Sequence, residues 1–266
     1  MLAGPIYLID RDIMETIIFE KSEQIVRIVF NRPPVNVLNI EMMQAINKFL
    51  EGLHNQDHVK LIIFSAVGKY FSAGVDMVDH APQRVFELLE AFHGIFLNLR
   101  DLARPTIAAV NGPALGAGCE LATFCDLVVA TENAKFGQPE IRVGVFPPIA
   151  AVVFPHLLSK KRTMELILTG ETIGAQEALT LGLVNRVVPS DKLDTAVDEL
   201  VKKIAVNSGS VLQMTKMAIA ASEGLNFPDA VKKVQDIYLN HLMPLEDTNE
   251  GLKAFLERRS PVWKDK

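Results

Sequence analysis

The sequence predicts an α/β fold in which a sheet-rich core is followed by a helical C-terminal region. Short β-branched and apolar segments, which are typical of strands, occur mainly in the first half of the chain. From about residue 149 onward the apolar residues recur mostly with a helical period. With 266 residues, 49% of them hydrophobic, the chain is long enough to bury a large core.

The first 70 residues show a strand pair, a helix and a further strand. Segments 15–20 and 25–30 are β-branched, and the charged residues between them predict a hairpin. Apolar residues recur with a helical period over 40–53, and the apolar run 59–67 predicts a buried strand. Because a strand–helix–strand order implies a crossover connection, we expect this strand to pair in parallel.

The alternation of strand and helix then repeats. We expect a helix over about 82–102, a strand over 106–112, a glycine-rich turn, the apolar stretch LATFCDLVVA, and a loop over 135–148. Later elements are expected at 183–188 (strand) and at 190–206, 211–222, 227–241 and 247–258 (helices).

The polar run Asn207-Ser208-Gly209-Ser210 separates two expected helices and predicts a boundary there. We therefore expect a core over 1–207 and a helical region over 208–266. Because Met14 offers an alternative start, residues 1–13 are interpreted as an N-terminal extension.

Composition argues against several partners and sites. The net charge of −5 provides no basic excess to neutralise nucleic-acid phosphates or anionic lipids. No apolar run reaches the roughly 18 residues that a membrane span requires. Only Cys119 and Cys125 are present, which suits neither a disulfide framework nor a zinc site and favours a cytoplasmic location.

The segment NGPALGAGCE, which follows an expected buried strand, is a candidate ligand site. Its glycines allow a sharp turn and close approach, and the following helix offers unpaired amides to a developing oxyanion. The alternative is that the glycines only allow strand and helix to pack closely. A dinucleotide fingerprint is a third interpretation, but Leu121 stands where its last glycine belongs.

Two carboxylates are candidates for acid–base chemistry. Glu120 lies in an apolar run, where an acid is paired, near a helix N-terminus or functional. Glu140 lies in a loop restricted by prolines. The alternatives are a first-turn glutamate that complements a helix dipole and a solvated loop acid, respectively. The segment FSAGVD (71–76) is a second glycine-bearing turn whose amides could face the same ligand, or an ordinary loop.

The order of these pieces resembles the enoyl-CoA hydratase/isomerase, or crotonase, superfamily over roughly Ile17 to Trp263. The resemblance rests on FSAGVD, on NGPALGAGCELATFCDLVVA followed by AKFGQPE, on TGETIGAQEALTLGLVNRVVP and on EGLKAFLERRSP. It implies a crotonase-like spiral of repeated ββα units with a helical C-terminal trimerisation region. It also implies a homotrimer or a homohexamer.

The resemblance further implies an acyl-CoA substrate and roles for particular residues. The amides of Ala73 and Ala117 would hold the thioester oxygen, with Gly74, Val75 and Asp76 completing the substrate-binding turn. Glu120 would orient and deprotonate water, and Glu140 would exchange a proton with the α-carbon. No metal and no cofactor are expected, since coenzyme A is part of the substrate.

The activity that this implies is reversible hydration of a conjugated enoyl- or dienoyl-CoA. An isomerase of the same fold and a non-catalytic acyl-CoA binding protein are the alternatives. The segments PPVNVLN, GVDMVDH and GVFPP resemble the cyclic dienoyl-CoA hydratases of anaerobic benzoyl-CoA breakdown.

One position departs from the family pattern. Pro148 stands where typical hydratases have a glycine whose amide helps to place the water, and proline has no amide hydrogen. We therefore expect a different placement of water, and we expect Phe146 and Phe154 to reshape the acyl pocket.

Overall fold

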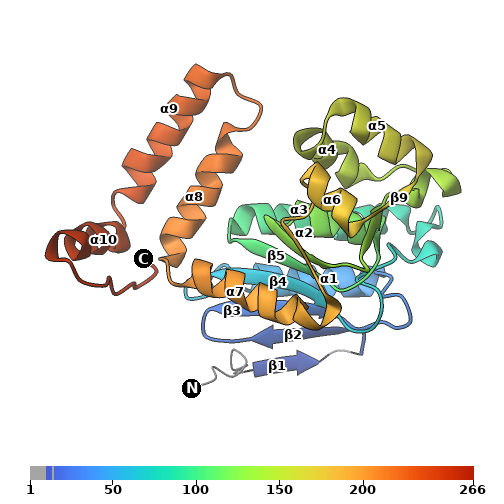
Figure 1. Ribbon diagram of the computed structural model, residues 1–266, viewed down its shortest axis with the longest axis horizontal. Coiled ribbons are helices and arrows are strands. Elements are labelled where there is room, and N and C mark those ends of the chain that lie inside the picture. The colour runs from blue at the N-terminus through green and yellow to red at the C-terminus, as the bar shows by residue number, and fades with distance from the viewer. Residues whose placement is uncertain (1–9, 14) are drawn as a thin grey trace.

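A seven-stranded sheet forms the centre of the protein, with strand order β1-β2-β3-β4-β5-β7-β10 (Figure 1). The computed structural model describes residues 10–13 and 15–266. The strands of this sheet are β1 (Asp10–Ile13), β2 (Ile17–Lys21), β3 (Ile25–Phe30), β4 (Leu61–Ala66), β5 (Thr106–Val110), β7 (Leu127–Thr131) and β10 (Arg186–Val188). A smaller sheet contains β6 (Ala114–Leu115), β8 (Lys135–Gly137) and β9 (Thr172–Gly174).

The strand pairing confirms the predicted hairpin and the predicted crossover. Strands β2 and β3 pair antiparallel, with Ile17 opposite Phe30. Strand β4 pairs parallel to β3, with Phe64 opposite Ile28, and the helix α1 (Ile40–Glu51) connects the two. The mixed α/β fold class predicted from the sequence is therefore confirmed.

Helices cover both faces of the large sheet because its strands are apolar on both sides. On β4, Ile62 and Phe64 belong to the larger core, to which α1, α2 (Val85–Leu102) and α3 (Ala117–Phe124) contribute. The alternate residues Leu61 and Ile63 pack instead with α7 (Leu193–Ala205) on the opposite face. This is the period of two expected for a strand buried between two layers.

The remaining helices form two groups, which Figure 1 shows on different sides of the molecule. One group is α4 (Pro148–Leu157), α5 (Lys160–Thr169) and α6 (Ala175–Leu181), which follow the short 3-10 helices η1 (Met77–His80) and η2 (Pro139–Val143) along the chain. The other group is α8 (Gly209–Ser222), α9 (Phe227–Ile237), the π-helical segment η4 (Tyr238–Leu242) and α10 (Glu246–Glu257), which we call the C-terminal arm.

Polar contacts fasten the C-terminal arm to the core. Lys216 Nζ lies 2.7 Å from Asp126 Oδ2 and 2.9 Å from the Arg104 carbonyl oxygen. Lys60, which is buried, forms an ion pair of 3.1 Å with Asp265 near the end of the chain. Asp265 also accepts a hydrogen bond from the Gly209 amide at the start of α8. The last residues of the chain thus connect the start of the arm to the residue that directly precedes strand β4.

Two details differ from the sequence-based expectations. Asp10–Ile13 pairs with β2, so these four residues belong to the sheet rather than to an extension; the rest of that extension, residues 1–9, lies outside the described residues. The segment 135–148, expected to be a loop, contains β8 and η2 and reaches the first residue of α4. Strand β8 pairs with β6 and β9, and such pairing between distant segments leaves no local periodicity to recognise.

Gly112 provides a test of how closely the central segments approach each other. A Cβ atom at this position would overlap the carbonyl oxygen of Lys69, which belongs to the backbone and cannot rotate away. We expect Gly112→Ala to lower the free energy of unfolding by roughly 3 kcal/mol, measured by urea denaturation. Gly52→Ala, at an exposed position with helical backbone angles, is the control and should change it by less than about 1 kcal/mol. Equal effects of the two substitutions would contradict this close approach.

Candidate active site

The two glycine-bearing turns predicted from the sequence lie side by side. The Phe71 amide donates to the Pro113 carbonyl oxygen at 3.0 Å, and the Leu115 amide donates to the Ser72 carbonyl oxygen at 2.8 Å. An ideal Cβ atom on Gly74 would lie 3.8 Å from the amide nitrogen of Ala117. The turn after β4 and the N-terminus of α3 therefore form one surface of main-chain groups.

Glu140 contacts this surface at Gly116. The backbone angles of Gly116, φ +52° and ψ −127°, are accessible to glycine and strained for other residues. A Cβ atom on Gly116 would overlap Oε1 of Glu140, so the carboxyl group of Glu140 occupies the space beside the turn. The same Cβ atom would lie 3.7 Å from the Cα atom of Gly74. Glu140 thus lies next to both turns.

The amide of Ala73 is already engaged in this structure. It donates to the Val35 carbonyl oxygen at 2.9 Å, while the carbonyl group of the same peptide unit, that of Ser72, accepts from Leu115 on the opposite side. Because a trans peptide directs its C=O and N–H in opposite directions, the Ala73 N–H points away from Ala117. This geometry does not favour the role that the resemblance implied for Ala73.

The peptide unit between Gly74 and Val75 has the opposite orientation to the one between Ser72 and Ala73. The Gly74 carbonyl oxygen accepts from the Leu38 amide at 2.8 Å, on the side of Val35. The Val75 N–H of that peptide unit therefore points to the side on which Ala114–Ala117 runs. Val75 N has no hydrogen-bond acceptor among the described residues, and Ala117 N, as a first-turn amide of α3, has no acceptor within its helix. Val75 and Ala117 are thus the two candidate donors.

Glu120 is buried, with 1% of its surface exposed, in the first turn of α3. Its Oε1 atom accepts two hydrogen bonds of 2.8 Å from the amides of Ile149 and Ala150. These amides belong to the first turn of α4, whose N-cap residue, Pro147, makes no side-chain capping bond. Glu120 therefore caps α4 from another helix, and its Oε2 atom has no partner among the described residues.

The two glutamates interact electrostatically. Burial, together with the charge of Glu140, raises the pKa of Glu120 to about 8, against the lowering effect of the Ala150 and Ile149 amides. Burial also raises the pKa of Glu140 to about 7. Oε2 of Glu140 is buried and has no hydrogen-bond partner among the described residues. The site therefore holds two carboxyl groups that exchange protons near neutral pH, as acid–base catalysis requires.

The amides of Ile149 and Ala150 are site groups that the sequence reasoning missed. Pro148 occupies the first position of α4, where an amide hydrogen has no intrahelical partner, so the proline costs the helix nothing there. The two amides that hold Glu120 come directly after it. Consecutive prolines before an apolar helical run were the available signal for a helix N-terminus at this place.

The other residues named from the sequence lie in different environments. Asp76 forms an ion pair of 2.7 Å with Arg32, and the hydrogen bond from Arg32 is the main cause that lowers its pKa. Phe146 is 66% exposed, whereas Phe154 is buried in the larger core. The expectation that Phe154 shapes a pocket is therefore wrong, because its ring packs inside the protein.

Two buried cysteines lie in and just after α3, and Cys119 directly precedes Glu120. Both Cys119 and Cys125 are free thiols, and burial raises the pKa of each, which keeps the sulfur protonated. Across the part of the chain that the structure describes, no group of three or more His, Cys, Asp or Glu side chains is arranged to hold a metal ion. The acid–base and hydrogen-bonding groups that the structure brings together here are the carboxyl groups of Glu120 and Glu140 and the nearby main-chain amides.

Comparisons with known proteins agree with this geometry. The family model described as enoyl-CoA hydratase/isomerase matches residues 20–266. A probable enoyl-CoA hydratase of Mycobacterium bovis is 36% identical over 256 residues, covering 93% of this chain and 97% of the relative. The cyclohexa-1,5-dienecarbonyl-CoA hydratase of Thauera aromatica is 32% identical over 248 residues, covering 93% of this chain and 95% of the relative.

Solved structures show the same fold. The enoyl-CoA hydratase of Bacillus anthracis superposes with a TM-score of 0.88 at 30% identity, covering 94% of this chain and 100% of the other. That of Mycobacterium smegmatis gives a TM-score of 0.87 at 30% identity, covering 93% and 98%. With its paired glutamates, its two adjoining turns and a match over nearly its whole length, the chain belongs to the enoyl-CoA hydratase/isomerase (crotonase) family.

Proposed function

We propose that this protein is an acyl-CoA hydratase that adds water reversibly to a conjugated enoyl- or dienoyl-CoA thioester. The observation that carries the proposal is the arrangement of two carboxyl groups, the buried Glu120 and the half-buried Glu140, beside the unpaired amides of Val75 and Ala117. A hydratase needs a base for water, an acid for the α-carbon and donors for the thioester oxygen. The relatives named as hydratases support this reaction class.

The amides act on the charge that develops when water adds. As the water oxygen attacks the β-carbon, the C=C electrons move toward the carbonyl and the thioester oxygen becomes an enolate oxygen. Fixed main-chain donors stabilise this negative charge more than they stabilise the neutral carbonyl of the substrate. Loss of one such donor typically costs about 2.7 to 4 kcal/mol of transition-state stabilisation. We assign this role to Val75 and Ala117.

The two glutamates divide the proton transfers. Glu120, held by the α4 amides through one oxygen, keeps its other oxygen available to accept a proton from the attacking water. Glu140 then delivers its proton to the α-carbon of the enolate. This requires one proton on the pair at the start, and that proton must lie on Glu140. With pKa values of about 8 for Glu120 and about 7 for Glu140, the pair carries one proton near neutral pH, and hydration starts from the form in which this proton has moved from Glu120 to Glu140. Dehydration uses the same steps in reverse.

For the acyl group we propose a conjugated ring, as in cyclohexa-1,5-diene-1-carbonyl-CoA. The relative from Thauera aromatica is named for that substrate, and the segments PPVNVLN, GVDMVDH and GVFPP support the same choice. The segment between Glu140 and α4 exposes several apolar side chains, with Val143 at 58%, Val145 at 40% and Phe146 at 66%, and it includes one charged residue, Arg142. Such apolar side chains suit a hydrocarbon ring that carries no polar group.

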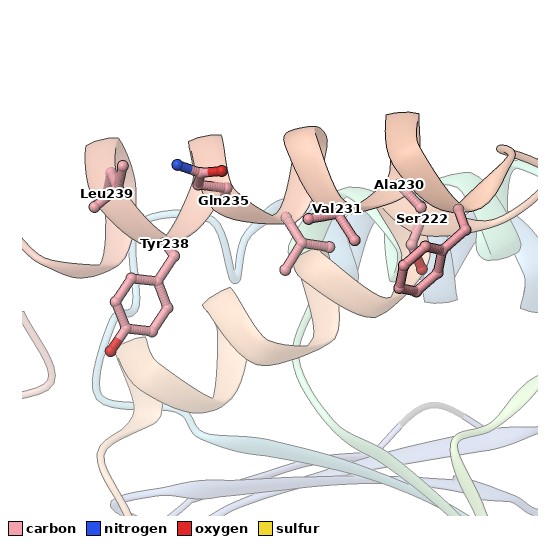
Figure 2. Close-up of a pocket in the computed structure, with 8 residues that line it drawn as sticks. Ser222, Ala230, Val231, Gln235, Tyr238 and Leu239 are labelled. Carbon is pink, nitrogen blue, oxygen red and sulfur yellow. The ribbon is translucent and has the colours of Figure 1, made fainter.

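We further propose a homotrimer or homohexamer formed through the C-terminal arm. No residue of α8 is buried, although much of that helix is apolar. Figure 2 shows a groove on the arm whose lining includes Val231, Tyr238 and Leu239 of α9 and η4 and Ser222 of α8. Phe227 (81%) and Tyr238 (54%) are exposed, and apolar surface of this kind is typical of an interface.

A cytoplasmic location is proposed on the basis of the two free thiols, which a reducing compartment maintains. Within 10–13 and 15–266, none of the helices has the length and apolar character needed to span a bilayer. We propose no metal and no cofactor apart from the coenzyme A that the substrate brings.

The substrate test uses purified enzyme with crotonyl-CoA, cyclohexa-1,5-diene-1-carbonyl-CoA and a panel of other enoyl-CoA thioesters. We expect hydroxyacyl-CoA products, detected by liquid chromatography and mass spectrometry, with the cyclic diene turned over fastest. Glu120→Gln and Glu140→Gln should each lower kcat for hydration by at least about 100-fold, because positioned acid–base groups contribute that much.

Glu199→Gln, at an exposed position on α7 across the sheet, is the matched control and should leave kcat unchanged. A one-base isomerase would give a different result. The wild type would move the double bond without adding water, and Glu120→Gln would retain this isomerase activity. Tight acyl-CoA binding without turnover of any thioester would indicate a binding protein.

The raised pKa values predict a bell-shaped pH profile of kcat/KM for hydration. The active enzyme carries one proton on the pair, so activity should be highest between about pH 7 and pH 8. Below this range both carboxyl groups are protonated and no base remains. Above it both are ionised and no acid remains. A profile that is flat from pH 5 to pH 9, measured by initial rates, would contradict the shared proton.

The proposed assembly predicts a molecular mass of three or six chains by size-exclusion chromatography with light scattering. Phe227→Glu together with Tyr238→Glu should shift the mass toward the monomer, since two charges would be buried at the interface. Asn55→Glu, which adds a charge at an exposed position after α1, should leave the mass unchanged. A monomeric wild type at micromolar concentration would refute the assembly.

A further inference from the structure

Arg32 lies outside the turns that carry the candidate donors, yet its side chain contacts both segments that position Val75. Its NH1 atom donates to the Val37 carbonyl oxygen at 3.2 Å. Its NH2 atom lies 2.7 Å from Oδ2 of Asp76, the residue that follows Val75. The guanidinium group therefore bridges the segment Val35–Leu38 and the turn that ends at Asp76.

The contact with Val37 continues through the main chain. The Val37 carbonyl belongs to the peptide unit whose N–H is that of Leu38, and this N–H donates to the Gly74 carbonyl oxygen at 2.8 Å. The Gly74 carbonyl in turn belongs to the peptide unit whose N–H is that of Val75. Arg32 is thus connected to the Val75 N–H by two peptide units in series. Hydrogen bonds in such a chain polarise one another in the same direction.

We infer that Arg32 is a positioning residue for the thioester-oxygen site, which orients and polarises the Val75 amide through the peptide units of Leu38 and Val75. This inference rests on the proposed function, because it assigns Arg32 a part in holding an acyl-CoA thioester. Arg32 itself does not touch the substrate.

The surroundings of Arg32 are built to hold this arrangement. Asn36 is buried and has φ +53°; its Oδ1 atom accepts from the Arg32 amide at 2.9 Å. Its Nδ2 atom donates to the carbonyl oxygens of Val67 and Tyr70 at 2.9 and 2.8 Å, just before the turn. On the other side of Val75, the Asp76 amide donates to the Leu38 carbonyl oxygen at 2.9 Å. The segment that carries Arg32 is thereby fixed at both ends.

Two substitutions separate the geometry from the charge. Arg32→Met keeps the apolar length of the side chain and removes both donors. Arg32→Lys keeps the positive charge, but a single ammonium group cannot reproduce the planar fork that reaches two segments. The matched control is Arg27→Met, because Arg27 is similarly exposed (24% against 28%) and pairs only with the exposed Asp194 among the described residues. Circular dichroism and thermal unfolding establish that each variant is folded.

The first measurement is the split between kcat and KM for hydration. Because the oxyanion forms in the transition state, we expect Arg32→Met to lower kcat by about 10- to 100-fold, less than the complete loss of a donor, and to change KM by less than about threefold. Arg32→Lys should fall between Arg32→Met and the wild type. Arg27→Met should match the wild type in both constants.

The second measurement is the infrared C=O stretch of a bound saturated acyl-CoA, compared with the same thioester in water. We expect the wild type to shift this stretch to lower wavenumber. The shift should be at least halved in Arg32→Met and unchanged in Arg27→Met. This readout needs binding of the thioester and no turnover, so it tests the role of Arg32 separately from the proposed function. If the wild type hydrates no thioester but Arg32→Met still loses the shift, the proposed function is refuted and the role of Arg32 is supported. An unchanged shift and an unchanged kcat in folded Arg32→Met would overturn the inference, as would a wild type that shows no shift.

Discussion

The capping of α4 by Glu120 is the interaction on which the site depends. A carboxyl group with 1% exposure needs hydrogen bonds to remain inside the protein, and the first amides of a helix need acceptors. The bonds from Ile149 and Ala150 satisfy both needs at once. They also tie α3 to α4, so the same contact places a carboxylate oxygen in the site and fixes the end of the segment that begins at Glu140.

The glycines around this contact have separate structural reasons. Gly112 admits the carbonyl group of Lys69, and Gly116 leaves room for the carboxyl group of Glu140. At Gly118 a Cβ atom would come within 2.6 Å of the Ser72 side chain and its carbonyl oxygen. The question left open by the sequence, whether these glycines serve packing or a ligand site, is therefore answered differently at each position. Packing at 112 and 118 brings the turns together, and the space at 116 holds an acid.

The direction of each main-chain N–H decides which amides can face a substrate. In the segment Ser72–Val75, the Ala73 N–H points to one side and the Val75 N–H to the other. Val35 and Leu38 bind the turn along one edge, and Leu115 binds it along the opposite edge. The Ala73 amide donates its hydrogen bond to Val35, which holds the turn, and the Val75 amide has no acceptor among the described residues. Arg32 stabilises this pattern from the outer edge, which extends the site beyond the residues that line it.

Local patterns in the sequence determined much of the fold and the identity of the acids. The hairpin of β2 and β3, the crossover through α1 and the four later helices follow from periodicity and turn residues, and an acid in an apolar run marked Glu120. Only the tertiary structure decided that Ile149 and Ala150 hold Glu120, that β8 pairs with β6 and β9, and that Val75 rather than Ala73 has a free amide. The physical reason is that hydrogen bonds between distant segments depend on the direction of individual peptide groups, and residue identity does not record that direction.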